Sequence, residues 1–221
     1  MKRIVIIVEG DTEKEFIDKV LSPYFHTKGI YAVDCFKIKH TKGGLTKYQH
    51  LKTDIINCIF ESNVIVTTLI DYYALPKDFP EFEDSKKIVN KSERISFLEE
   101  AITHDIQNYK KIEFNNLIPY IQLHEFEALV FASLNGILNL YTDSQAKFTE
   151  INDILKQYTN PEDINEGSDS APSKRLRNLI PGYNKIVDGI MIIEENGIEN
   201  ILKKCPRFNS WVNFLIAKAL E

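Results

Sequence analysis

Long hydrophobic runs are absent from this sequence. Near the start of the chain the longest purely apolar run is residues 4–8, far short of the roughly 20 residues that span a bilayer. Glu9, Gly10 and Asp11 follow at once, so the N-terminus has no signal-peptide core. We therefore expect a cytoplasmic protein that does not enter the membrane.

Cysteine is scarce and the familiar catalytic motifs are missing. The 221 residues contain three cysteines, Cys35, Cys58 and Cys205, and no C-x-x-C pair, which argues against a structural zinc site and favours buried reduced thiols. The sequence also lacks a G-x-S-x-G elbow, a dinucleotide-binding glycine fingerprint and a P-loop. These absences argue against the corresponding hydrolases, dehydrogenases and NTPases.

Positive charge is in the minority overall but is concentrated in two blocks. The formal net charge is −5, which argues against a protein that coats nucleic acid nonspecifically. Residues 37–52 carry five lysines and no carboxylate, and residues 170–187 carry two lysines and two arginines with no acid. Each block is either a solvated face or a local contact surface for phosphate groups.

Alternating apolar runs and amphipathic segments predict an α/β fold in the first half. We expect four strands and three helices, the first helix beginning with a capping box of Thr12 and Glu15. Strands that are apolar on both faces indicate a parallel sheet covered by helices on either side. The expected strands are residues 4–8, 30–38, 64–70 and 117–123, and the expected helices are 12–21, 46–60 and 93–107.

The second half shows helical spacing and no strand pattern. We therefore predict an α/β core at residues 1–125 and a helical extension at 126–221 that packs on the core. Trp211 and Phe214 are the expected anchors of the last helix. The expected helices are residues 126–133, 144–158, 172–179, 186–193, 198–203 and 209–220.

Carboxylates follow three of the predicted strands. Glu9 comes directly after the first strand, Asp71 after the third, and Glu125 just past the fourth, with Glu127 two residues on. The carboxyl ends of parallel strands share one edge of a sheet, so these side chains are candidates for one site. Oxygen ligands of this kind suit Mg²⁺ or Mn²⁺. The alternative for each residue is a role in a turn or at a helix N-terminus.

Two further segments are candidates for phosphate contacts. Lys42 lies in a loop with Gly43 and Gly44. Lys174 and Arg175 lie in the first turn of a predicted helix, where backbone N–H groups attract anions. A solvated loop and a solvated helix start are the alternatives.

Taken together, these motifs resemble a known family. Glu9-Gly10-Asp11-Thr12-Glu13 followed by Asp71-Tyr72-Tyr73 resembles the Toprim domain, which serves primases, topoisomerases and the overcoming-lysogenization-defect (OLD) nucleases. The chain as a whole looks like the bacterial family numbered four-two-seven-six among the domains of unknown function. The motifs that carry this second resemblance are residues 9–13, 71–73, 123–129, 171–176, 181–185 and 205–211.

The resemblance implies a Toprim-like fold and magnesium-dependent cleavage of a phosphodiester bond in nucleic acid. Glu9 and Asp71 would bind the metal or, for Glu9, transfer a proton. The Toprim pattern has Asp-x-Asp after the third strand, whereas this sequence has Tyr73 at the second position, so Glu125 or Glu127 would supply the missing ligand or a single metal would bind. Lys42 and Lys174 would contribute to catalysis, and with Arg175 they would contact phosphate.

The resemblance also implies a partner, because members of the family often occur beside ATPase genes, as in phage-defence systems. One alternative is therefore a non-catalytic partner or sensor module of an ATPase complex. Another is a phosphohydrolase that acts on a small nucleotide.

Overall fold

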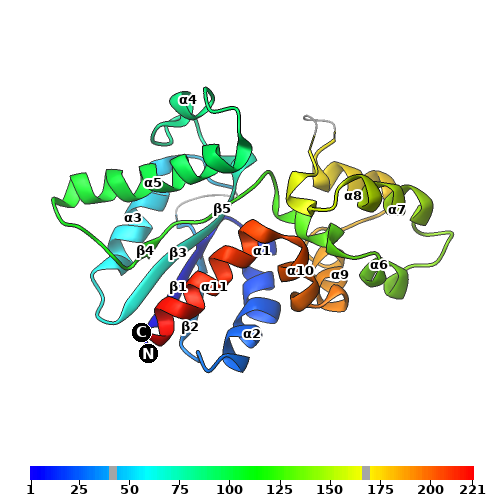
Figure 1. Cartoon of the computed structure of the whole chain (residues 1–221), viewed down its shortest axis with the longest axis horizontal. Helices are drawn as coiled ribbons and strands as arrows, with labels where there is room; N and C mark the ends of the chain where they lie inside the picture. The colour runs from blue at the N-terminus through cyan, green and yellow to red at the C-terminus, as the bar shows by residue number, and fades with distance from the viewer. Residues whose placement is uncertain (40–43, 166–169) are drawn as a thin grey trace.

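The chain forms a parallel α/β sheet, seen here in a computed structural model that describes residues 1–39, 44–165 and 170–221 (Figure 1). The strand order is β2-β1-β3-β4, and β5 also pairs with β3; every pairing is parallel. The strands are β1 (Arg3–Val8), β2 (Val33–Lys37), β3 (Val64–Asp71), β4 (Leu117–Ile118) and β5 (Ile121–Gln122). The predicted α/β class and parallel sheet of about four strands flanked by helices are confirmed.

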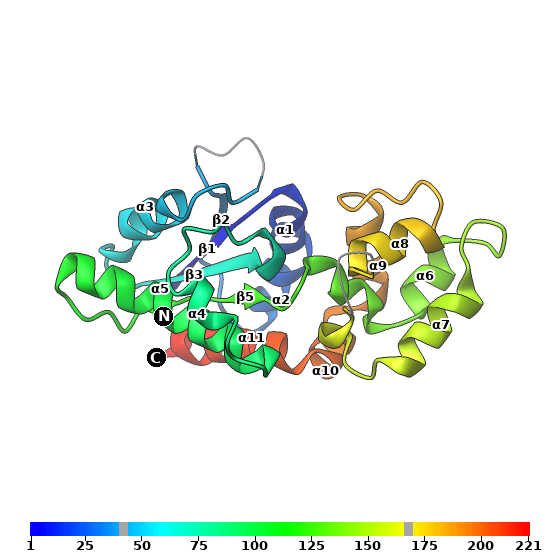
Figure 2. The same ribbon diagram turned by 90° about the horizontal axis from the view of Figure 1, so that it is seen from above.

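Helices cover both faces of the sheet. Alternate residues of β1 and β3 pack into two separate apolar clusters, as expected for strands buried on both sides. One face carries α3 (Tyr48–Ile59) and α5 (Lys91–Lys110). The other face carries α11 (Pro206–Leu220) and the continuous run of α1 (Asp11–Phe16), the π-helical η1 (Ile17–Leu21) and α2 (Ser22–Thr27), as Figures 1 and 2 show.

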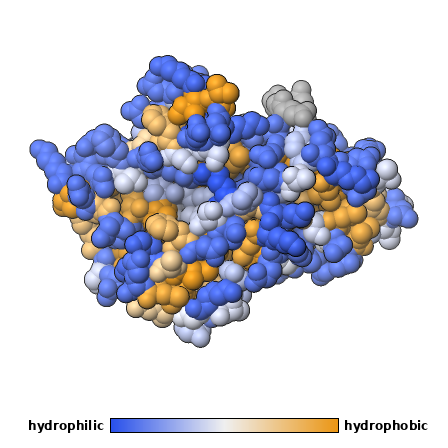
Figure 3. All heavy atoms as spheres, viewed as in Figure 1, coloured by the Kyte–Doolittle hydropathy of each residue, from blue (hydrophilic) through white to orange (hydrophobic). Residues whose placement is uncertain are grey.

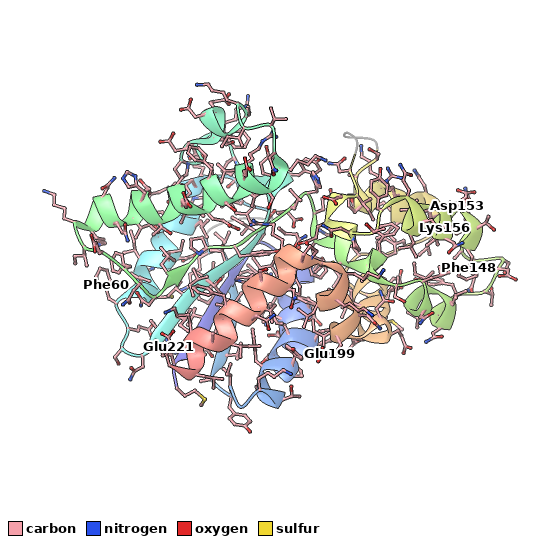
Figure 4. The ribbon with its side chains drawn as sticks, viewed as in Figure 1. Phe60, Phe148, Asp153, Lys156, Glu199 and Glu221 are labelled. Carbon is pink, nitrogen blue, oxygen red and sulfur yellow. The ribbon has the colours of Figure 1, made fainter. Side chains whose placement is uncertain are left out.

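A group of shorter helices lies beyond the carboxyl ends of the strands. The arrows of β3 and β5 point toward this group in Figure 2. Phe148, Asp153 and Lys156 of α7 lie at the end of the molecule opposite Phe60 (Figure 4). The elements of this group are η3 (Phe126–Ala132), α6 (Asn135–Leu140), α7 (Phe148–Gln157), η4 (Pro161–Asp163), α8 (Pro172–Leu179), α9 (Asp188–Asn196) and α10 (Ile198–Lys204). Two other short helices, η2 (Tyr72–Ala74) and α4 (Phe82–Ser85), lie between β3 and α5 in the chain.

The last helix returns to the sheet. Trp211 on α11 is buried, and its indole N–H donates to Thr67 Oγ1 on β3 at 2.9 Å. The prediction that Phe214 is an anchor was wrong, because Phe214 is 49% exposed while Trp211, Val212 and Leu215 form the buried side of the helix. Lys2 and Glu221 form an ion pair at 3.5 Å, so the two ends of the chain lie side by side (Figure 1).

Two local predictions from the sequence were wrong. The expected strand 117–123 is broken into β4 and β5 at Pro119 and Tyr120, because proline has no N–H for the ladder. The Thr68 hydroxyl replaces the missing ladder there, donating to Tyr120 O at 2.8 Å and accepting from Tyr120 N–H at 2.9 Å. The first helix has Gly10 rather than Thr12 at its N-cap and no side-chain capping bond.

The surface is mostly polar. Hydrophilic residues cover much of the face in Figure 3, and the hydrophobic ones form separate patches. None of the helices in the described part of the chain has both the length and the apolar character to cross a bilayer.

A buried carboxylate joins the short helices to α11. Glu162 is fully buried, and its two carboxylate oxygens accept hydrogen bonds from the backbone N–H groups of Arg207 (2.9 Å) and Phe208 (3.0 Å). These two groups lie in the first turn of α11, where backbone donors have no partner within the helix. Glu162 is therefore a capping residue supplied from a distant part of the chain.

We expect Glu162→Ala to lower the free energy of unfolding by about 3 kcal/mol, since two buried N–H groups lose a charged acceptor. Glu162→Gln keeps one acceptor oxygen and should cost less. Urea unfolding followed by circular dichroism measures both. The matched control is Glu199→Ala at an exposed position of α10, which should change stability by less than about 0.5 kcal/mol. An equal effect of Glu162→Ala and Glu199→Ala would contradict the capping role.

Candidate functional site

The carboxyl ends of β1 and β3 bring Glu9 and Asp71 together. Val8 pairs with Leu69 in the parallel register, so the two strands end side by side. The Glu9 carboxylate accepts hydrogen bonds from the backbone N–H groups of Asp71 and Leu45. Two residues 62 positions apart in sequence thus share one edge of the sheet, as the strand-end pattern predicted.

The backbone approaches these carboxylates closely at two glycines. A Cβ atom on Gly44 would lie 3.3 Å from Glu9 Oε1, and Gly44 has a φ of +74°, which favours glycine. A Cβ atom on Gly10 would lie 3.0 Å from Glu13 Oε2. The small residues allow the chain to wrap around the carboxylates without displacing them.

Asp71 and Glu125 each accept a hydrogen bond from a helix start. The backbone N–H of Phe126, first residue of η3, donates to Asp71 Oδ1 at 2.9 Å. The N–H of Ser173, in the first turn of α8, donates to Glu125 Oε2 at 3.0 Å. The start of α8 was expected to attract a phosphate, and in the structure it binds the protein's own carboxylate.

Glu13 and Glu127 are the most buried acids at this edge. Glu13 on α1 is 4% exposed and Glu127 on η3 is 3% exposed. Lys185, in the segment between α8 and α9, lies across from them, with Nζ 4.0 Å from Glu127 Oε1. Glu127 was a candidate ligand from the sequence, Glu13 was not assigned a role, and Lys185 was counted only within the basic block of residues 170–187. Glu13 and Lys185 also lie within motifs of the family resemblance.

Burial raises the pKa of four carboxyl groups here. Desolvation is the main cause for Glu9, Glu13, Asp71 and Glu127. The mutual repulsion of the carboxylates adds to it: at Asp71 the charges of Glu13, Glu127, Glu9 and Glu125 all raise the pKa further. The edge of the sheet therefore holds more negative charge than the protein compensates.

The Lys185 ammonium opposes this repulsion. Burial alone would lower the pKa of Lys185, but the carboxylates of Glu127, Glu13, Asp71 and Glu9 outweigh it, and the pKa is raised. Lys185 in turn lowers the pKa of Glu9, Glu13 and Glu127. The acids and the lysine form one electrostatic unit, which we call the acidic cluster: Glu9, Glu13, Asp71, Glu125, Glu127 and Lys185.

Of the other predicted site residues, the structure describes Lys174 and Arg175. Lys42 falls outside the described residues. Lys174 is exposed on α8. Arg175 donates from Nε to Ser170 O at 2.7 Å, and its guanidinium lies 5.7 Å from the centre of the Tyr158 ring, so it supports the start of α8. Tyr73 is 45% exposed and packs beside His124, with 5.4 Å between ring centres.

The donor set fits a hard cation held by few protein ligands. In residues 1–39, 44–165 and 170–221, no group of three Asp, Glu, His or Cys side chains is placed to hold a metal ion. However, Glu9 Oε2 is buried without a hydrogen-bond partner among these residues, and it belongs to a carboxylate beside Asp71. Magnesium is commonly bound by one or two carboxylates, with water and substrate phosphate completing its coordination. Glu9 and Asp71 meet that requirement.

The raised pKa values predict how stability depends on pH. A carboxyl group whose pKa is higher in the folded than in the unfolded protein stabilises the fold below its unfolded value, near pH 4.3 for glutamate, and this contribution is lost as pH rises through the folded value. Glu13→Gln removes the charge and should make the metal-free protein more stable than wild type at pH 8. The difference should disappear near pH 4.

Urea unfolding in EDTA across this pH range measures the effect of Glu13→Gln. The exposed Glu113→Gln is the matched control and should follow the wild type at every pH. A gain from Glu13→Gln that stays constant with pH would show that packing, not charge, is responsible.

Comparison with known proteins identifies the family. Searches of curated proteins and of solved structures gave no match. A family description, Domain of unknown function (DUF4276), matches residues 8–216, nearly the whole chain. The chain therefore belongs to the DUF4276 family.

Proposed function

We propose that the protein is a metal-dependent nuclease of Toprim-like type, related to the OLD nucleases, that hydrolyses a phosphodiester bond at the acidic cluster. The observation that carries the proposal is the position of Glu9 and Asp71, adjacent at the carboxyl ends of β1 and β3 with a surplus of negative charge around them. A Mg²⁺ or Mn²⁺ ion is the partner that such a surplus favours. The Toprim pattern has its two acidic positions after the same two strands.

Glu9 and Asp71 would hold the ion, with Glu125 and Glu127 as the nearby acids from the fourth strand end. The ion would stabilise the charge that develops on the phosphate oxygens and would help to activate water. Glu9 has a second role in the proposal, because burial raises its pKa and a carboxyl group with a raised pKa can transfer a proton. Lys185 lies at the cluster, with Nζ 4.0 Å from Glu127 Oε1, so in the proposal it contacts phosphate beside Lys42, Lys174 and Arg175.

A non-catalytic role beside an ATPase, as in a phage-defence complex, is the alternative. The observation that favours it is Tyr73, which stands where the Toprim pattern has its second aspartate and lies against His124 rather than in the acidic cluster. In that case the cluster would bind no divalent ion with useful affinity. Metal binding therefore separates the two functions.

We expect Mn²⁺ to stabilise the wild-type protein by about 2.7 kcal/mol at a concentration 100 times its Kd, because it binds only the folded state. Glu9→Gln and Asp71→Asn should each lose this stabilisation while keeping a native circular dichroism spectrum. Calorimetric titration and thermal unfolding measure it, and Glu113→Gln is the control that should behave as wild type.

The same variants should lower the rate of cleavage of labelled single-stranded and duplex DNA and RNA by about 10² or more. The panel includes mononucleotides, so that a small-nucleotide phosphohydrolase would be recognised. Folded Glu9→Gln with full metal binding and unchanged cleavage would refute the proposal. Wild-type protein that binds no Mn²⁺ in the presence or absence of DNA would favour the ATPase-associated role.

A further inference from the structure

A polar cavity lies beside the same strand ends, lined by residues next to Asp71 and Glu125. Its volume is about 490 Å³, within the range of small-ligand sites. It is formed where η2 and the segment after β5 meet the start of α5. The residues that matter here are Tyr72, Tyr73, Lys91, Arg94 and His124.

The described wall of this cavity carries two cationic side chains. Lys91 and Arg94 both line it, and no carboxylate among the described residues does. Neither cation forms an ion pair with a described Asp or Glu; Arg94 donates instead to the carbonyl of Ile88 at 2.7 Å and to Tyr72 Oη at 3.4 Å. A larger cavity of about 720 Å³ shares Lys91, but Glu162 and Asp163 also line it, so it suits an anion less well.

His124 presents an unused hydrogen-bond donor in this cavity. The residue is 5% exposed, and its Nδ1 lies 3.2 Å from the Asn165 amide nitrogen, which donates to it. Because Nδ1 accepts this hydrogen bond, the hydrogen of the imidazole ring lies on Nε2. That Nε2 is buried with no partner among the described residues. A buried donor beside two cations that pair with no described carboxylate suits an anionic ligand.

An aromatic ring lies at the mouth of the cavity. Tyr73 is 45% exposed, and its ring lies 5.4 Å from that of His124. Exposed aromatic rings beside cationic groups bind nucleotides by stacking on the base while the cations contact the phosphate. The cavity therefore combines the two features that a nucleotide requires.

We propose that this cavity binds one nucleotide unit, with its phosphate between Lys91, Arg94 and the Nε2–H group of His124 and its base against Tyr73. The proposal deepens the proposed function, on which it rests for the idea that this unit belongs to the strand being cleaved. The cavity and the acidic cluster share two backbone segments: Asp71 precedes Tyr72, and Glu125 follows His124. A nucleotide in the cavity would place its neighbour next to the cluster.

Binding is tested without metal, so that it does not depend on cleavage. The probe is a six-residue thymidine strand with a 5′-phosphate and a 3′-fluorescein, titrated with wild-type protein in EDTA and followed by anisotropy. Lys91→Gln and Tyr73→Ala should each raise the Kd about tenfold, the loss expected for a charged contact or a stacked base. Tyr73→Phe keeps the ring and should stay within twofold of wild type.

The matched controls lie at exposed positions away from the cavity. Lys203→Gln on α10 removes the same charge, and Tyr31→Ala removes another exposed tyrosine ring. Both should leave the Kd within twofold. If the cavity variants weaken binding no more than these controls, or if wild-type protein fails to bind the probe at millimolar concentration, the proposal is wrong.

Competition identifies the source of the nucleotide. Thymidine 5′-monophosphate should displace the probe, whereas thymidine and inorganic phosphate should each be at least tenfold weaker. A strand at least tenfold tighter than the mononucleotide supports a substrate strand in the cavity, and equal affinities support a free nucleotide. Wild-type protein that binds the strand in EDTA but cleaves no nucleic acid with Mg²⁺ or Mn²⁺ would leave this site intact and refute only the nuclease proposal.

Discussion

The repulsion between buried carboxylates at one edge of the sheet is the constraint on which the rest of the structure depends. Five acids that follow β1 or lie in α1, in β3 and after β5 are close enough to repel one another. Burial raises the pKa of four of them, namely Glu9, Glu13, Asp71 and Glu127. The fold tolerates this because backbone N–H groups of distant segments donate to Glu9, Asp71 and Glu125, and because Lys185 faces the cluster. A protein selected only for stability would place neutral side chains here.

Holding these acids in place explains why the short helices and the sheet are joined so firmly. The first turns of η3 and α8 donate to Asp71 and Glu125, so the helical part is attached to the strand ends through the acids themselves. Further along, Glu162 caps α11, whose Trp211 donates to Thr67 on the central strand β3. The chain leaves the sheet after β5, forms the short helices beside the acidic cluster and returns to the sheet as α11. A movement of the short helices relative to the sheet would therefore displace the carboxylates.

The sequence predicts the parts of this arrangement that depend on local pattern. Apolar runs predicted β1 and β3, and the carboxylates after them predicted which residues would meet, because parallel strands share their carboxyl ends. Contacts between distant segments could not be predicted in this way. The helix start at Pro172 suggested an external anion, but the Ser173 N–H group donates to Glu125, which lies 48 residues earlier in the sequence. Likewise, Phe214 and Trp211 fit the same helix equally well, and only the packing against β3 decides which is buried.

The geometry of His124 separates two sites of opposite charge. It adopts a φ of +69°, a left-handed conformation that is uncommon for residues other than glycine and costs about 1–3 kcal/mol. The carbonyl of His124 accepts from Tyr73 N–H at 3.3 Å and its ring is fixed by Asn165, so the surroundings enforce the strained turn. Because of this turn, two consecutive residues belong to different sites. His124 lines the cationic cavity, and the charge of Glu125 raises the pKa of Asp71 in the acidic cluster. A nucleic-acid strand has a phosphate on either side of each sugar, so a strand crossing this turn would meet the cationic wall at one phosphate and the acidic cluster, the proposed metal site, at the next.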